Sequence, residues 1–216
     1  MAYSDFTLES AIQRLGLTMS PPVDMFAALP PVPVRPMFAE LLVDQITVAT
    51  AVHTEKARSE LIVVPILMEA RRQAGRPTSF FSGVPFDVSP ELGLNGICNF
   101  LLCLSPNQFI IGPPVLAVVE AKNDSIRGGL GQCAAEMVAA QLFNQKQAID
   151  DFAGQPDLLY GAVTTGSLWR FLRLQGAQLQ IDQSEYTPDQ VGKILAILME
   201  CLSYPDGEKV RLGGNS

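Results

Sequence analysis

The triplet Glu120-Ala121-Lys122 places a carboxylate and an amine at the end of an apolar run, residues 115–119. Side chains alternate along a β-strand, so Glu120 and Lys122 emerge on one face, about 6.5 Å apart along the strand. That geometry can hold a divalent cation beside a charged amine. Because ionisable groups at the end of an apolar strand are costly to desolvate without partners, the triplet is a candidate site. The alternative is an ordinary ion pair where a strand enters solvent, since three-residue motifs recur by chance.

The elements that position this triplet can be read from the flanking pattern. Residues 97–104 form a second strand-like run, and turn signals at 105–107 and 112–114 separate it from the triplet's strand. The glycines at 128–131 predict a break, after which residues 132–143 predict an alanine-rich helix suited to lying on a sheet. Two further strands are expected at 158–165 and 168–174. The order of helix, three strands, helix and more strands predicts an α/β fold.

With these pieces in place, residues 54–174 resemble the PD-(D/E)XK nuclease superfamily. Glu120-Ala121-Lys122 matches the (D/E)XK triplet, Asn99 stands where the preceding acid is expected, and the helix opening at Gln132 follows in order. Residues 163–171 are also similar to the strand pair after that helix in nuclease domains of restriction systems. The resemblance implies a restriction-endonuclease-like fold, with a three-layer core in which helices flank a central mixed β-sheet. It also implies a magnesium-dependent phosphodiester hydrolase acting on DNA or RNA.

The resemblance further implies a role for each site residue. Glu120, the side-chain oxygen of Asn99 and a further acid would hold Mg²⁺ or Mn²⁺ against a phosphate oxygen. Lys122 would position the attacking water and help to deprotonate it, and Gln132 would orient Lys122 or the phosphate. The alternative for Gln132 and Glu136 is a polar helix face, since residues four apart are neighbours there.

The main departure from the family pattern is Asn99, because active members usually carry Asp at this position. Asparagine offers a carbonyl oxygen but no charge, and magnesium at a hydrolytic site leans on one or two carboxylates. We therefore expect weak metal binding and impaired or absent catalysis. Asp87, or a carboxylate from the first helix of the match, would restore the missing charge.

Glu60 is the candidate acid from that first helix, and it lies at the edge of an apolar stripe with helical spacing. The stripe consists of Ala57, Leu61, Val64 and Met68. On the same helical pattern, Glu55 is expected to point to the opposite face. The alternative for Glu60 is an ion pair with Arg71 or Arg72. Pro65 is expected to kink this helix or to mark a boundary in it.

Composition limits the range of functions. With 216 residues, of which 48% are hydrophobic, the chain is long enough to bury one sizeable core. Its net charge of −7 and its pI near 4.7 argue against a broad electrostatic grip on nucleic acid. Nucleic acid would then bind at a local site, with basic patches expected either at Arg71, Arg72 and Arg76 or at Arg170 and Arg173.

The cysteines and the chain termini suggest a cytoplasmic protein with no membrane partner. The four cysteines show neither CxxC spacing nor grouping with the single histidine, which favours buried thiols in a reducing compartment over zinc. Cys98 and Cys103 have opposite parity on one strand and are expected to face opposite sides. No charged and apolar leader begins the sequence, and no apolar run is long enough to span a bilayer.

The sequence divides into three parts. Residues 1–53 hold helices expected at 6–15 and 38–49, joined by a proline-dense arm that either straps across its own domain or clasps a second subunit in a homodimer. Residues 54–204 form the nuclease-like domain, which ends in a helix capped by Thr187, and residues 205–216 are expected to form a flexible tail. Two functions remain open: a hydrolase with a weakened site, and a noncatalytic module for binding or assembly on the same scaffold.

Overall fold

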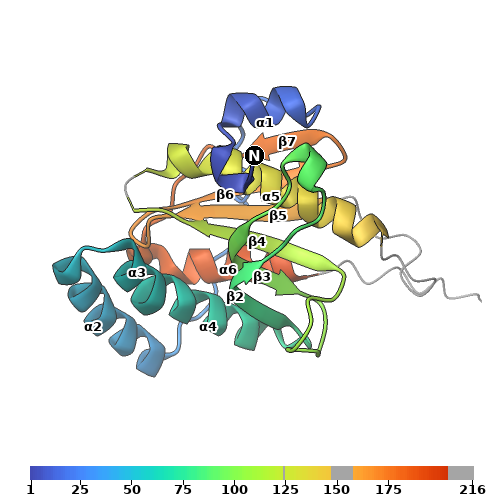
Figure 1. Ribbon diagram of the computed structural model, residues 1–216. Helices are drawn as coiled ribbons and strands as arrows, with labels where there is room; N and C mark the ends of the chain where they lie inside the picture. The colour runs from blue at the N-terminus through green and yellow to red at the C-terminus, as the bar shows by residue number, and fades with distance from the viewer. Residues whose placement is uncertain (124, 147–157, 204–216) are drawn as a thin grey trace, which may run out of the picture.

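The structure, a computed structural model, describes residues 1–123, 125–146 and 158–203, and the predicted tail lies outside these ranges. It is an α/β fold in three layers, with helices on both faces of a mixed seven-stranded sheet (Figure 1). The strands are β1 (Thr18–Met19), β2 (Ser79–Pro85), β3 (Ile97–Cys103), β4 (Val115–Ala121), β5 (Leu158–Thr164), β6 (Trp169–Gln175) and β7 (Gln178–Ile181). The helices are α1 (Leu8–Arg14), α2 (Pro36–Val52), α3 (Glu55–Arg58), α4 (Val64–Ala74), α5 (Ile126–Lys146) and α6 (Val191–Leu202). Short helical turns are η1 (Tyr3–Asp5), η2 (Ser59–Val63), η3 (Pro90–Leu92) and η5 (Pro188–Gln190).

The sheet has the strand order β1-β7-β6-β5-β4-β3-β2. β2, β3 and β4 form an antiparallel meander, whereas β4 and β5 are parallel and are joined across α5. A parallel pair needs such a crossover, and this one places α5 on one face of the sheet. The carboxyl ends of β4 and β5 therefore lie side by side, and the candidate triplet closes β4 there.

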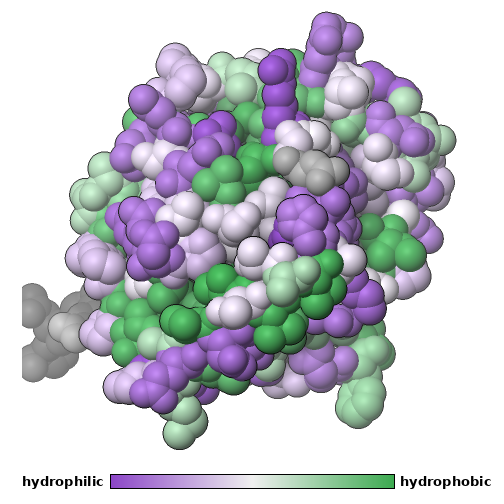
Figure 2. Space-filling view, turned by 90° about the vertical axis from the view of Figure 1, so that its left-hand side faces the viewer, coloured by the Kyte–Doolittle hydropathy of each residue, from purple (hydrophilic) through white to green (hydrophobic). Residues whose placement is uncertain are grey.

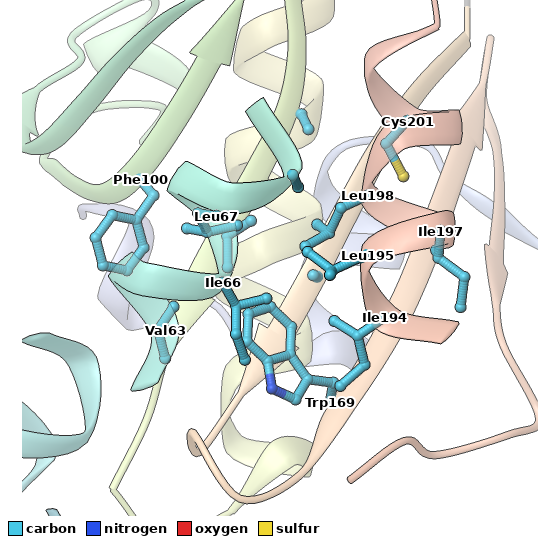
Figure 3. Close-up of a cluster of buried hydrophobic side chains, with 14 of the residues drawn as sticks. Val63, Ile66, Leu67, Phe100, Trp169, Ile194, Leu195, Ile197, Leu198 and Cys201 are labelled. Atoms are coloured by element: carbon cyan, nitrogen blue, oxygen red, sulfur yellow. The ribbon is translucent and has the colours of Figure 1, made fainter. Parts of the chain in front are cut away.

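Each face of the sheet carries its own apolar cluster. On the face covered by α4 and α6, Trp169 from β6 packs against Ile66 from α4 and Ile194 from α6 (Figure 3). The opposite face is covered by α5 and α1, where small residues such as Ala134 and Ala135 let the helix lie close to the sheet. The predicted α/β class is confirmed.

The start of α5 differs from the expectation that residues 128–131 break the chain. The helix begins at Ile126 and runs through these glycines. A β-carbon at Gly129 would lie 2.6 Å from Val163, and one at Gly131 would lie 2.2 Å from the backbone of Thr7. The glycines therefore allow β5 and the N-terminal segment to approach the helix, a packing requirement that outweighs their low helix propensity.

The first helix of the match is not a regular α-helix. A π-helical turn, η2, separates α3 from α4, and Pro65 lies in the first turn of α4, so the expected boundary at Pro65 is confirmed. The wider turn changes the helical phase, so that the buried residues are not those of the expected stripe. The buried apolar residues are Ile62, Val63, Ile66, Leu67 and Ala70, whereas Met68 is 40% exposed.

The proline-dense arm straps across its own domain. The Val32 amide donates a hydrogen bond to the Gly192 carbonyl on α6 (3.0 Å), and Lys193 donates to the carbonyls of Phe26 and Leu29. A β-carbon at Gly192 would lie 2.7 Å from the Val32 oxygen, so glycine permits this close approach. Of the two alternatives for the arm, the structure shows the contact within one chain.

Candidate functional site

The candidate site lies at the carboxyl end of β4, on the face that α5 covers. Glu120 is the last polar residue of β4 and is 2% exposed, while Lys122 follows the strand and is half-buried. The Lys122 amide donates to the Thr164 carbonyl of β5 (2.8 Å), which fixes the backbone just beyond the strand end. The two side chains meet on one face, as strand alternation requires, and Lys122 Nζ lies 2.8 Å from Glu120 Oε1.

Gln132 and Glu136, one turn apart on α5, continue this network into the protein. Lys122 Nζ donates to Gln132 Oε1 (2.7 Å), and Gln132 Nε2 donates to Glu136 Oε1 (3.0 Å). Gln132 is 7% exposed and Glu136 is fully buried, so they do not form a solvated polar face. The chain of contacts fixes the orientation of Gln132, because its oxygen accepts from the ammonium and its amide nitrogen donates to a carboxyl.

Two buried carboxyls thus lie near one ammonium, which contacts Glu120 directly and is linked to Glu136 through Gln132, and both carboxyls are harder to ionise than usual. Burial raises the pKa of Glu120 to about 7, although Lys122 favours the charged form. Burial and the Glu120 charge raise the pKa of Glu136 well above its ordinary value. A hydrogen bond between the two carboxyls lowers the pKa of Glu120 and raises that of Glu136, so Glu136 is the harder of the two to ionise.

The outer oxygens of these carboxyls lack donors when both groups are ionised. Within the described part of the chain, Glu120 Oε2 and Glu136 Oε2 are buried and have no other hydrogen-bond partner. An unsatisfied buried oxygen is costly, and it needs a proton, a donor or a cation. The pair is therefore arranged to bind positive charge in addition to that of Lys122.

Asn99 lies on β3 next to Glu120, because the β3–β4 register pairs Phe100 with Val119. Its side-chain oxygen accepts a hydrogen bond from the Ala121 amide (3.2 Å), in place of a backbone carbonyl where the β3–β4 ladder ends. A carbonyl oxygen has a second lone pair, so this bond leaves one acceptor position. Asn99 is thus a neighbour of Glu120 that also closes the end of the ladder.

Neither alternative acid occupies this network in the way the sequence suggested. Asp87 is exposed in the connection between β2 and β3, where it accepts a hydrogen bond from the Gly96 amide (2.8 Å). The Glu60 carboxylate is 59% exposed and pairs with Lys56 (2.8 Å) rather than with Arg71 or Arg72. Glu55, on the same segment, is exposed, and its charge contributes to the raised pKa of Glu120.

Two cysteines line the inner end of the network. Burial and the charge of Glu136 raise the thiol pKa of both Cys98 and Cys133, and Cys98 also hydrogen-bonds Glu136. Cys98 and Cys103 belong to the same apolar cluster, contrary to the expected opposite faces, because regular pairing of β3 with β4 stops before Cys98. All four cysteines are buried free thiols. The neutral thiols of Cys98 and Cys133 make this end of the site apolar.

The arginines expected to form basic patches have structural partners. Arg71 donates to the Thr78 carbonyl, Arg72 pairs with Glu69 (2.8 Å), and Arg170 pairs with Glu185 (2.7 Å). Arg58 was not considered in the sequence, yet it lies next to the site and donates to the Asn123 carbonyl (2.7 Å). The only feature of the sequence that could have pointed to Arg58 is its position in the first turn of the helix that Thr54 caps.

No protein-family model, curated protein or solved structure matches the chain. Among the described residues, no three of the His, Cys, Asp and Glu side chains gather as a metal-binding group. No helix in the same ranges has the length and apolar content needed to cross a bilayer. The geometry at the end of β4 therefore has to carry the functional argument.

Proposed function

We propose that this chain is a nuclease-like protein, a metal-dependent phosphodiester hydrolase of the restriction-endonuclease-like type. The observation that carries the proposal is Lys122 Nζ, which lies 2.8 Å from Glu120 and 2.7 Å from Gln132, beside two buried carboxyl oxygens that have no partner outside the Glu120–Glu136 pair. The order α4, β2, β3, β4, α5 and β5, with an antiparallel meander followed by a parallel strand, agrees with the fold that the resemblance implies.

A divalent cation fits the donor set at this site. Glu120 Oε2 and Glu136 Oε2 are buried acceptors, and the Asn99 oxygen supplies a third, neutral ligand nearby. Hard cations such as Mg²⁺ prefer oxygen ligands of these types. When bound, the cation would supply charge neutralisation for a phosphate group and a lowered pKa for a coordinated water.

The side chains of the site have separate tasks in this proposal. Lys122 holds the attacking water and stabilises negative charge, because its ammonium is fixed between Glu120 and Gln132. Gln132 keeps the ammonium oriented through its own bond to Glu136. Without a cation, the raised pKa of Glu136 favours its neutral form and thereby limits the negative charge beside Glu120.

A noncatalytic module for binding or assembly is the second candidate, and Asn99 favours it. The neutral amide stands where an acid is expected, and its oxygen already accepts the Ala121 amide. The net charge of −7 also limits the affinity for nucleic acid that electrostatics alone could give. This candidate predicts binding without turnover.

Cleavage assays on Lys122→Ala separate the two candidates. The variant lacks the group that positions water but keeps the apolar core, so a hydrolase should lose a factor on the order of 100 or more in cleavage rate. Lys56→Ala is the matched control, since Lys56 is 82% exposed and pairs only with Glu60 in the described chain. Both variants should be assayed on single-stranded and duplex DNA and RNA with Mg²⁺ or Mn²⁺. Equal inactivity of the native protein and Lys122→Ala on all substrates would sink the hydrolase proposal.

A further inference from the structure

A cavity of about 690 Å³ opens beside the candidate site and is not used by the proposed chemistry. We refer to it as the α2 cavity. Its walls come from α2, from α3 with η2, from the ends of β4 and β5, and from η5. The lining residues are Val43, Ile46, Thr50, His53, Arg58, Ile62, Asn123, Thr165, Ser167, Pro188 and Asp189. Its volume lies within the range of about 300–1,000 Å³ that is usual for small-molecule sites.

The α2 cavity and the candidate site share one strand end. Asn123 lines the cavity and directly follows Lys122, while Thr165 follows β5. Ligands in α/β sheets bind outside the carboxyl ends of parallel strands, which is where both features lie. Figure 2 faces this end of the molecule, and patches of hydrophobic residues lie among hydrophilic ones in its lower half, on the side where α2 lies in Figure 1. The cavity and the candidate site therefore meet at consecutive residues of one strand end, Lys122 and Asn123.

The lining combines apolar walls with fixed polar groups. Val43, Ile46 and Ile62 offer aliphatic surface, which suits a planar ring. The hydroxyls of Thr165 and Ser167 are 3.1 Å apart at the β5–β6 turn, where they can bind a sugar hydroxyl or a base edge. Asp189 supplies an acceptor for ring or exocyclic N–H groups.

Arg58 gives the α2 cavity an oriented positive charge. Its guanidinium donates to the Asn123 carbonyl (2.7 Å) and contacts His53 Nδ1 (2.9 Å), and it forms no ion pair within the described ranges. A β-carbon at Gly166 would lie 3.0 Å from the Arg58 side chain, so the β5–β6 turn packs closely against the arginine. A guanidinium held in this way and not neutralised by a carboxylate suits a phosphate.

His53 has a backbone conformation that is unfavourable for its residue type. It ends α2 with φ = 58°, in the left-handed region where glycine is the usual residue. That conformation places the imidazole against Arg58 at the cavity wall. Because glycine would adopt this conformation without strain, the presence of histidine here suggests that the side chain has a function.

We propose that the α2 cavity binds one unpaired nucleotide next to the scissile phosphate, with the base against Val43, Ile46 and Ile62 and a phosphate at Arg58 and His53. This inference rests on the proposed function for its substrate class. It does not require turnover, because the cavity would bind the nucleotide whether or not Lys122 supports hydrolysis. An unpaired nucleotide is required, since a base within a duplex cannot enter a cavity.

The test is fluorescence anisotropy with labelled single-stranded and duplex DNA and RNA oligonucleotides of the same sequence, in EDTA to prevent cleavage. We expect single strands to bind more tightly than duplexes. Arg58→Gln should weaken single-strand binding at least tenfold, whereas Arg14→Gln, the same charge change on α1 far from the cavity, should change affinity by less than twofold.

His53→Gly keeps the proposal falsifiable if Arg58→Gln fails to fold. Glycine suits the left-handed conformation, so the melting temperature should stay the same or rise, while single-strand affinity should fall at least threefold. A purely structural role would change stability and leave affinity intact.

The outcomes separate this inference from the proposed function. Equal losses in Arg58→Gln and Arg14→Gln, no binding by the native protein, or native affinity in His53→Gly would overturn the nucleotide cavity. Binding that depends on Arg58 in a protein without cleavage would support the cavity and overturn the hydrolase.

Discussion

Two buried glutamates of this protein, Glu69 and Glu120, occupy environments with opposite electrostatic balance. Glu69 on α4 is 4% exposed, and it accepts hydrogen bonds from Arg35, Arg72 and Gln73. These partners hold the pKa of its carboxyl well below the usual range, against the effect of burial. Glu120 is equally buried, but burial outweighs its one ammonium partner and raises its pKa to about 7.

The difference separates a structural role from a functional one. Both oxygens of Glu69 have donors, and Arg35 links the start of α2 to α4, so the group is complete within the fold. The Glu120–Glu136 pair has two oxygens with no partner outside the pair, and it carries more negative than positive charge when both carboxyls are ionised. A fold retains such an incomplete group at a cost, and ligand binding is the usual reason.

Glu69→Ala should have the largest effect on stability. Deletion of the carboxylate removes the link between α2 and α4 and leaves Arg35 and Arg72 without their partner. Both arginines are about half exposed and can be rehydrated, which limits the loss to about 2–3 kcal/mol in the free energy of unfolding. Urea denaturation at pH 7 measures this loss, with Glu60→Ala on the exposed Lys56 pair as the control, for which about 0.5 kcal/mol is expected. A loss below 1 kcal/mol for Glu69→Ala would contradict its structural role.

The same comparison shows how far sequence reasoning reaches. Strand alternation placed Glu120 and Lys122 on one face, because that rule depends only on neighbouring residues. Helical spacing failed for Glu60, which is exposed and paired with Lys56, since the π-helical turn at residues 59–63 changes the helical phase and has no clear signal in the local pattern. The local pattern predicts a break at Gly129 and Gly131, since the contacts that require these glycines, with Val163 and Thr7, are distant in sequence.

The partners of the buried acids were the part of the structure that was hardest to predict from the sequence. Glu69 has an arginine partner on its own helix, at a spacing of three residues, and another in the proline-dense arm, which only the tertiary fold brings together. Glu136 was considered as part of a polar face, yet the packing of α5 on the sheet buries it completely. The sequence identifies the acids, but the tertiary fold decides which of them are buried and which of the buried ones have enough hydrogen-bond donors.

The contribution of Glu136 to the free energy of unfolding should depend on pH in the opposite direction to that of Glu69, and Glu136→Gln tests this. The raised pKa of Glu136 means that the folded state holds its proton more tightly than the unfolded chain. This contribution is fully present below the unfolded pKa, near 4.5, and is lost as the pH rises toward the folded pKa. The substituted amide cannot ionise, so the variant should gain stability over the native protein by up to about 1.4 kcal/mol per pH unit in that range.

Thermal melts from pH 5 to pH 8 measure this gain, and Glu69→Gln is the matched control. The lowered pKa of Glu69 gives a contribution that is present above its unfolded pKa and is lost as the pH falls. The range from pH 5 to pH 8 lies above that unfolded pKa, near 4.5, so the deficit of Glu69→Gln should stay constant across these melts and shrink only in more acidic solution. Parallel curves for Glu136→Gln and the native protein would show that Glu136 is not held in its protonated form.

Asn99→Asp tests whether the incomplete charge at Glu120 is a cation site. The introduced carboxylate can still accept the Ala121 amide while it adds one negative charge beside Glu120, so Mg²⁺ should bind about tenfold more tightly than to the native protein. Calorimetry measures both affinities, and Asn107→Asp, the same charge change on an exposed residue, should leave the affinity nearly unchanged. Because like charges repel, Asn99→Asp should also lower stability without metal, and added Mg²⁺ should recover that loss. Equal magnesium affinities in the native protein and Asn99→Asp would mean that residue 99 does not face the cation. The buried Oε2 atoms of Glu120 and Glu136 would then need another explanation.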